Sequence, residues 1–333
     1  MISERVRTNL KSTFSASLLP KIGLALLVAM LFLSVFAPVL ATHDPTRTGS
    51  FDENGQPYPP AGVEYTTEVA AGGEITEVTV ESTSEHRLGT NDVGQDVYSR
   101  FLYGARISLI VGLLGTGLAV LIGVPFGLVS GYYGGRIDAG MMRIADVMLA
   151  FPALVLALAL IGVFGESPVE IPDPIVMAGF AEGMPETVPI PGTVTVVVAL
   201  VTWVWFARVA RGEALSLRNQ EYVKAAKSFG ASNGTILRRH VLPNSLTPII
   251  VLATIQIAVI ILLEASLAYL GFSGTTLSWG YEIERGQDLL RTRPWISVLP
   301  GIGIMLAVIG MNLLGDWLRD ALDPNIDGSN RGI

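Results

Sequence analysis

The sequence predicts an all-α membrane protein with six transmembrane helices. Half of the 333 residues are hydrophobic, 15% are charged and the mean hydropathy is +0.52, which excludes one or two ordinary soluble domains. Six runs without an acidic or basic side chain are long enough to cross roughly 30 Å of hydrocarbon as helices. These long apolar runs favour helices over alternating barrel strands, because hydrocarbon offers no partners to backbone N–H and C=O groups.

The predicted spans come in the following order along the chain: residues 22–43, 107–135, 147–165, 187–207, 240–263 and 294–315. The fifth run continues past Glu264 to residue 281. Val39-Leu40-Ala41 resembles a signal cleavage site, but the long apolar run and the polar lead before it favour an uncleaved anchor. The predicted parts are an N-terminal segment 1–21, a first helix 22–41, a polar segment 42–105, a five-helix core 106–318 and a tail 319–333.

The distribution of basic residues predicts the orientation in the membrane. The loop between spans four and five, residues 208–246, is rich in basic residues: Arg208, Arg211, Arg218, Lys224, Lys227, Arg238 and Arg239. The loop between spans three and four has no Lys or Arg but five acidic residues: Glu166, Glu170, Asp173, Glu182 and Glu186. Because basic loops stay inside, loop 208–246 and both termini are predicted to be cytoplasmic, and segment 42–105 external.

The external segment is predicted to contain a β-hairpin. Residues 63–69 and 75–81 alternate as strands do, and Ala71-Gly72-Gly73 supplies turn residues between them. An isolated hairpin is marginal in water, so we expect it to pack on the membrane domain or on a partner. The whole chain carries 29 acidic against 22 basic residues, and an acidic, Lys-poor outer surface favours a salt-rich habitat and a halophilic source.

Loop 208–246 is predicted to form two short helices. Residues 220–229 are helical in character, and Gly230 stands where a left-handed C-terminal cap would fall. Ser232 can cap a second helix, residues 233–241, before Pro243 opens the next span. Two small amphipathic helices in a basic loop would make a docking surface, although they could also be only a compact hairpin at the membrane surface.

The spacing in this loop resembles the signature of binding-protein-dependent ATP-binding-cassette permeases. The positions that match this coupling signature are Glu221, Ala225, Ala226, Gly230, Leu242 and Pro243. Lys224 stands where the family pattern has Glu, and His240 where it has Ile. A short helix held in a groove of a separate ATPase could pass on its motion, since small residues allow close approach and Gly permits the bend.

Two further segments are similar to the peptide and nickel subfamily of these permeases. One is residues 86–108, ahead of the second span. The other is the C-terminal signature, which includes Gly315, Asp316, Arg319, Asp320, Asp323 and Pro324. There, Asp316 and Arg319 lie about one helical turn apart, and the end of the helix could be merely solvated or could touch the ATPase.

The resemblance implies the second of the two permease subunits of a dipeptide or oligopeptide importer, with nickel or an oligosaccharide as alternative cargo. It also implies the other permease subunit as a partner, two ATP-binding subunits that hold ATP and magnesium, and an external substrate-binding protein. This chain has no phosphate-binding Gly-rich motif and no cysteine, so we expect no bound cofactor, no metal, no enzymatic activity and no nucleic-acid partner. The bilayer of the cell membrane is its remaining partner.

Two acidic residues near the spans allow a competing interpretation. Glu264 lies inside the fifth span, where it could line the translocation route or satisfy a structural partner such as an Arg. Asp146 is expected to pair with Arg143 at the membrane surface. A proton-coupled secondary transporter would use Glu264 or Asp146, and a requirement for ATP separates it from the importer. An intramembrane hydrolase is disfavoured, because none of the three histidines lies deep in a span.

Overall fold

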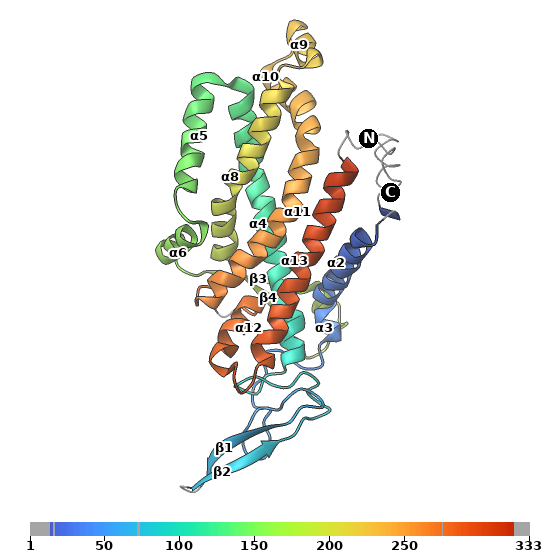
Figure 1. The fold of residues 1–333 in the computed structure, drawn as a ribbon, viewed down its shortest axis with the longest axis vertical. Helices are drawn as coiled ribbons and strands as arrows, with labels where there is room; N and C mark the ends of the chain where they lie inside the picture. The colour runs from blue at the N-terminus through green and yellow to red at the C-terminus, as the bar shows by residue number, and fades with distance from the viewer. Residues whose placement is uncertain (1–13, 16, 72–73, 275, 323–333) are drawn as a thin grey trace.

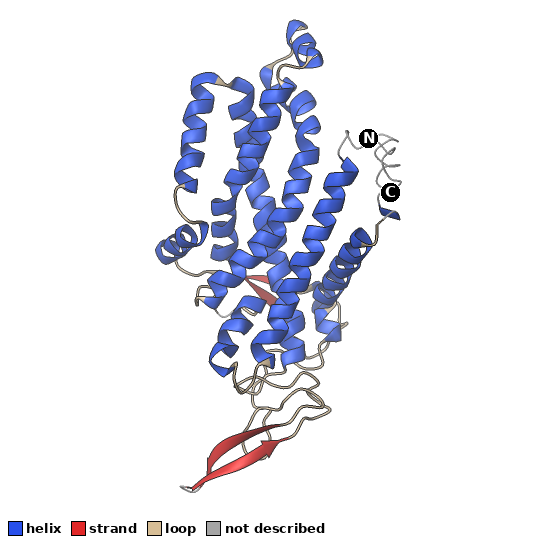
Figure 2. Cartoon of the chain, viewed as in Figure 1, coloured by secondary structure: helices blue, strands red, loops and turns tan. Residues whose placement is uncertain are grey.

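The computed structural model describes residues 14–15, 17–71, 74–274 and 276–322. Helices form most of this part of the chain, and strands occur in two short hairpins (Figure 2). The long helices run side by side along one axis, with the β1–β2 hairpin at one end and α9 and α10 at the other (Figure 1). Phe14 stacks edge-on against Trp317, with ring centroids 5.5 Å apart, so the two ends of the described chain lie together.

The elements follow the chain in this order: α2 (Leu19–Val35), α3 (Ala37–Leu40), β1 (Tyr65–Ala71), β2 (Glu74–Val80), α4 (Val97–Tyr133), α5 (Gly135–Leu149), α6 (Ala153–Phe164), β3 (Pro168–Pro172), α7 (Pro174–Met177), β4 (Thr187–Pro191), α8 (Gly192–Leu217), α9 (Glu221–Ser228), α10 (Asn233–Ile236), the π-helical turn η1 (Leu237–Val241), α11 (Leu242–Tyr269), α12 (Trp279–Gly286), the 3₁₀ turn η2 (Gln287–Leu289) and α13 (Trp295–Leu322).

Four helices are long and apolar enough to cross a membrane unaided: Val97–Tyr133, Gly192–Leu217, Asn233–Tyr269 and Trp295–Leu322. A fifth candidate is the pair α5 and α6, which is bent by 88°. The helix α2, in the first predicted span, has 17 residues and is followed by α3 after a break at Phe36. By length and composition, the described part of the chain is therefore a helical bundle with four to five membrane spans, and the first predicted span corresponds to the shorter apolar helix α2.

The third predicted span is not one straight helix. The helix α6 has 12 residues and reaches about 18 Å, which is too short to cross the hydrocarbon. Pro152 precedes it in an extended conformation and has no N–H to continue α5. The bend therefore joins α6 to α5. Most of α5, including Arg136 and Asp138, lies before residue 147, where the third charge-free run begins.

The helix α4 begins ten residues before the second predicted span. Asp96 caps its first turn by accepting the Ser99 N–H at 2.8 Å. Arg100 and Arg106 then lie buried inside the helix. A search for charge-free runs leaves both residues out of the span, because it stops at every charged side chain. Both are neutralised by acidic partners on other elements, which makes their burial tolerable.

Loop 208–246 is shorter than predicted at both of its ends. Residues 208–217 belong to α8, and the second predicted helix is not separate but runs through η1 into α11. The fifth span also stops before residue 281: α11 ends at Tyr269, where Gly271 takes a positive φ of 86°. The short helix α12 follows as an element of its own.

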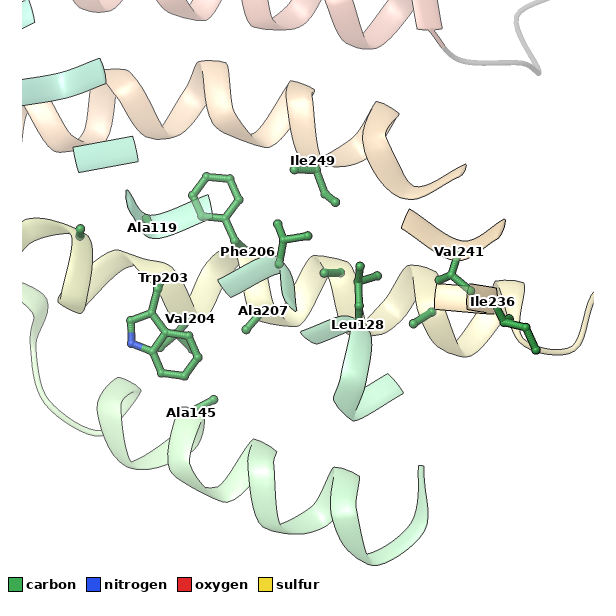
Figure 3. Packing of buried hydrophobic residues seen from close by; sticks show 14 of the residues in the cluster. Ala119, Leu128, Ala145, Trp203, Val204, Phe206, Ala207, Ile236, Val241 and Ile249 are labelled. Carbon is green, nitrogen blue, oxygen red and sulfur yellow. The ribbon is translucent and has the colours of Figure 1, made fainter. Parts of the chain in front are cut away.

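The core is built around the contact between α4 and α8. Gly123, Gly127 and Gly131 of α4 face the α8 backbone, and a Cβ at Gly131 would lie 2.9 Å from that of Ala214. Small residues at this spacing let two helices approach closely and pack without voids. Trp203 and Phe206 of α8 fill the adjoining core, a cluster with Ala119, Leu128, Ala145 and Ile249 (Figure 3).

Two antiparallel hairpins complete the fold. In the first, β1 pairs with β2 so that Thr67 lies opposite Val78, close to the strands expected at 63–69 and 75–81. The second hairpin was not predicted: β3 lies in the acidic loop, whereas β4 takes up residues 187–191 at the start of the fourth predicted span, so α8 begins only at Gly192. The register of this hairpin pairs Glu170 with Pro189. Prolines at three of its four strand ends, and within β4, conceal the strand pattern from sequence analysis.

Candidate functional site

The candidate site is the projecting element formed by α9 and α10, called here the coupling element (residues 221–236). Val223 of α9 is buried against the core around α8, and Ala226 packs against the same cluster. Glu221 and Lys224 face outward and form an exposed ion pair at 2.9 Å. This amphipathic pattern holds one face of α9 on the bundle and leaves Ala225 and the charged residues on the open face.

Gly230 ends α9 in the left-handed conformation that the sequence predicts, with φ of 82°. The N–H of Ala231 bonds the Ala226 carbonyl at 3.1 Å, and the N–H of Gly230 bonds the Lys227 carbonyl at 3.0 Å. These two bonds define a Schellman motif. A Cβ on Gly230 would meet no heavy atom within 4 Å, so the requirement for Gly is conformational and not one of space.

Ser232 caps the second helix as predicted, accepting the Thr235 N–H at 3.3 Å. Ile236 and Val241 are fully buried in the core around α8. The chain then enters α11 through Leu242 and Pro243 without a break. Pro243 has no N–H to bond the preceding turn, and the wide π turn η1 lies directly before it. The turn η1 therefore joins α10 to α11 in one continuous helical segment.

Polar contacts fasten the coupling element, and the end of α8 just before it, to α4. The Tyr132 hydroxyl bonds the Asn233 side-chain oxygen at 3.0 Å, and the Arg218 guanidinium donates to the Gly131 carbonyl at 3.1 Å. A cleft of about 310 Å³ between these elements is lined by residues that include Tyr133 and Lys227. The element is thus braced at its base, and its far end is free.

The most exposed large apolar side chain of the coupling element lies at its bend. Phe229 is 91% exposed, and Tyr222 on α9 is 41% exposed. Both lie among the basic residues that the sequence placed in this loop. A solvent-exposed aromatic on a rigid, positively charged projection is typical of a surface that meets another protein.

Asp146 makes a different ion pair from the one predicted. Its carboxylate accepts a hydrogen bond from Arg208 of α8 at 2.7 Å, and the expected partner, Arg143, is not involved. Nearby, Arg211 of α8 binds Asp138 of α5 through two bonds of 2.5 and 2.6 Å. Sequence spacing within one helix suggested Arg143, whereas α8 supplies the partner across the bundle.

Glu264 is fully buried, apart from the coupling element, where α11 meets α4 and α12. The Ser108 hydroxyl donates to one carboxyl oxygen at 3.3 Å. The same hydroxyl accepts a hydrogen bond from the backbone N–H of Trp279 at 3.3 Å. The other carboxyl oxygen has no hydrogen-bond partner in the described part of the chain. No ion pair in the described part of the chain includes Glu264, so of the alternatives left open by the sequence, the structural partner found there is the Ser108 hydroxyl and not an Arg.

One residue of the C-terminal signature is buried in a contact between helices, and three others are exposed. Gly315 is buried where α13 meets α11, and a Cβ there would lie 2.7 Å from the Thr254 hydroxyl. Asp316, Arg319 and Asp320 are exposed, and no ion pair joins Asp316 to Arg319 among the residues described. Asp323 and Pro324 fall outside those residues. The structure brings this signature next to the chain start and not to the coupling element.

Two buried ion pairs were missed by sequence analysis. Arg100 of α4 binds Glu282 of α12, and Arg106 of α4 binds Asp173, which follows β3. The only signal was the presence of two Arg residues just before a span, within the segment 86–108. Their partners lie far along the chain, so no local pattern could identify them.

The bundle has several membrane-span candidates and carries an exposed helical projection between two of them, an arrangement that fits the membrane subunit of a transporter. The chain belongs to the family described as the binding-protein-dependent transport system inner membrane component, whose profile matches residues 123–328. This confirms the resemblance found in the sequence. The subunit is the membrane-embedded permease of an ATP-binding-cassette importer.

Several curated proteins are similar over nearly the whole chain. A dipeptide transport system permease protein of Alkalihalophilus pseudofirmus is 33% identical, covering 92% of this chain and 85% of its own length. A probable D,D-dipeptide transport system permease protein of Escherichia coli is 35% identical, covering 91% and 86%. An oligopeptide transport system permease protein of Bacillus subtilis is 31% identical, covering 94% and 88%.

Among solved structures, an inward-facing form of the MetNI methionine ABC transporter is similar in fold, with a TM-score of 0.51. At 15% identity it covers 67% of this chain and 97% of its own. This likeness shows that the two chains share a fold.

Proposed function

We propose that this chain forms half of the transmembrane pathway of a peptide importer. The relatives named above are dipeptide and oligopeptide permeases, and each aligns over most of this chain. A second permease subunit would complete the pathway, an external binding protein would deliver the peptide, and two ATPase subunits with ATP and magnesium would supply energy. This chain itself would bind no ATP and would not hydrolyse it.

The observation that carries the proposal is the exposure of Phe229 at the tip of the coupling element. The capped bend and the Tyr132–Asn233 bond hold the backbone that carries this ring. An aromatic anchor of this kind would fill a pocket on an ATPase subunit, with the basic residues around it at the rim. Movement of that pocket would pass through α10 and η1 into α11.

The test uses the complete importer reconstituted in liposomes. Phe229→Ser is expected to lower peptide uptake and binding-protein-stimulated ATP hydrolysis by about tenfold or more, because a buried aromatic anchor contributes at least about 2 kcal/mol. Ile75→Ser is the matched control, since Ile75 is 71% exposed on the hairpin at the opposite end. Wild-type uptake with Phe229→Ser would contradict the docking proposal.

The orientation in the membrane is part of the same proposal. Six passages would place both termini and the coupling element in the cytoplasm and the β1–β2 hairpin outside. The chain has no cysteine, so Glu68→Cys and Lys224→Cys introduce single labels at exposed positions on opposite ends. In intact cells an impermeant thiol reagent should label Glu68→Cys alone. Labelling of Lys224→Cys alone would reverse the topology.

The proton-coupled alternative has less support. Asp146 is tied to Arg208 at the surface, and Glu264 is sealed between helices with Ser108 as its bonded neighbour. A proton carrier needs access to water from each side in turn. Uptake that needs ATP in the absence of a proton gradient would exclude the carrier, and uptake driven by a gradient without ATP would exclude the importer.

A further inference from the structure

Two histidines and a glutamate meet at the hairpin end of the bundle. His43 lies just after α3, while Glu85 and His86 lie in the segment between β2 and α4. One ligand atom from each of the three lies within 4.8 Å of the other two. The imidazole rings have centroids 4.5 Å apart, and the His43 Nε2 is 3.5 Å from a Glu85 oxygen.

A buried carboxylate already orients one of these rings. The Nδ1 of His86 is 2.9 Å from a carboxyl oxygen of Asp96, and both side chains are almost completely buried. Asp96 is itself fixed by its bonds to Ser99 at the start of α4. A carboxylate on Nδ1 holds the proton there and leaves Nε2 with a free lone pair, which is the arrangement behind most histidine metal ligands.

The remaining ligands are accessible. The side chain of His43 is 21% exposed and that of Glu85 is 71% exposed. Glu85 can therefore turn toward the two rings without disturbing the fold. Two neutral imidazoles, one carboxylate and a water make up the four-coordinate set that suits Zn²⁺. The Glu85 and Asp96 charges together would balance the ion.

We propose that His43, Glu85 and His86 form a binding site for a zinc-like divalent ion, with Asp96 as the residue that positions His86. A bound ion would join the end of α3 to the segment that carries the hairpin and to the cap of α4. The site is independent of the coupling element, which lies at the other end of the bundle (Figure 1). It restrains the polar segment relative to the helices.

The composition of the chain makes the site simple to test. There are three histidines and no cysteines, so few other groups compete for zinc. His240 is the third histidine and lies in η1 beside the coupling element, which makes His240→Gln a matched control. Glu85→Gln is the mildest change within the site because its side chain is mostly exposed.

The experiment titrates Zn²⁺ by calorimetry into the purified full-length chain, freed of metal by a chelator and carrying no polyhistidine tag. We expect one ion per chain, binding at least about tenfold weaker in His43→Gln and in Glu85→Gln, and unchanged binding in His240→Gln. Cobalt(II) added to the wild type should give the intense visible absorption of a tetrahedral site, which Glu85→Gln should weaken.

Three results would overturn the proposal. They are no binding by the wild type, wild-type affinity in both site variants, and loss of binding in His240→Gln. If His43→Gln did not yield folded protein, Glu85→Gln would decide between the two outcomes on its own.

Discussion

Arg100 of α4 forms hydrogen bonds to Glu282 of α12 through two of its nitrogen atoms, although the two residues are 182 positions apart in the sequence. The Nε of Arg100 lies 3.0 Å from each carboxyl oxygen, and the side chains are 6% and 2% exposed. A further bond runs from Arg100 to the Pro45 carbonyl at 2.8 Å. One guanidinium thus joins the polar segment, α4 and α12.

Removing one partner of this pair should destabilise the chain strongly. Glu282→Ala leaves a buried guanidinium without its counter-ion, at a cost of about 3–5 kcal/mol in the free energy of unfolding. The double variant Arg100→Met with Glu282→Leu should recover most of that loss, because no unpaired charge remains. Chemical or thermal unfolding of the chain in detergent micelles measures both.

The exposed pair Arg285 and Asp92 is the control for this prediction. Its atoms are 2.8 Å apart, but the side chains are 28% and 33% exposed. Asp92→Ala should cost less than about 1 kcal/mol. A loss in Glu282→Ala no larger than that in Asp92→Ala would contradict the structural role of the buried pair.

The contact between α4 and α8 should tolerate no added methyl group at Gly127. A Cβ there would overlap the backbone of Ala207, which cannot rotate away. We expect Gly127→Ala to lower stability by about 1–3 kcal/mol, as overpacking does elsewhere. Gly117 lies on the same helix with no heavy atom within 4 Å of such a Cβ.

For that reason Gly117→Ala should be neutral or stabilising by up to about 1 kcal/mol, through helix propensity alone. The thermal midpoint of each variant in the same detergent gives the comparison. Equal effects at the two positions would mean that α4 and α8 are not in close contact.

The bend at Gly230 should transmit ATPase motion, so damage there should uncouple transport without unfolding the bundle. Gly230→Val forces a β-branched residue into a left-handed conformation at a cost of about 1–2 kcal/mol. Because the spans are stabilised by their own packing, we expect normal membrane abundance with near-zero uptake and ATPase activity that loaded binding protein no longer stimulates.

Two variants sharpen this prediction. Gly230→Asn should keep much of the activity, since Asn tolerates the left-handed conformation best among the larger residues. Gly234→Ala, in α10 with ordinary backbone angles and open space, should behave as the wild type. Full transport in Gly230→Val would refute the coupling assignment, and loss of all membrane-inserted protein in Gly230→Val, with Gly230→Asn normal, would make the role of the bend structural.

The buried carboxyl of Glu264 should act through its hydrogen bonds. Glu264→Gln retains an oxygen for the Ser108 hydroxyl, whereas Glu264→Leu leaves the Ser108 O–H without an acceptor at a cost of about 1–3 kcal/mol. We therefore expect uptake and stability to survive better in Gln than in Leu. Uptake assays alongside thermal unfolding separate the two effects, and equal loss of uptake with unchanged stability would indicate a charge-linked role.

Much of the site could be predicted because its determinants are local. Gly230 and Ser232 are cap residues, whose backbone preferences are set within a few bonds, and both take the predicted roles. The membrane character of the chain rests on composition, and the family resemblance on spacings within one loop. The habitat of the organism and the identity of the transported cargo stay predictions.

The boundaries and the charged contacts could not be predicted in this way. Arg100 and Arg106 ended the charge-free run, yet α4 contains both, because Glu282 and Asp173 neutralise them from distant parts of the chain. Asp146 pairs with Arg208 and not with Arg143 one turn away, because α8 brings Arg208 across the bundle. The pairing of α5 with α6 into one bent candidate span could not be predicted either, because it also depends on the packing of the two helices.

The sequence by itself thus determined which segments are apolar, where helices are capped and which family signature the loop carries, since each depends on residues that are neighbours along the chain. The tertiary structure alone decided which buried charges are paired, how closely α4 approaches α8, and that His43 meets His86 beside Asp96. Those relationships depend on distances between segments that only the packed bundle brings together.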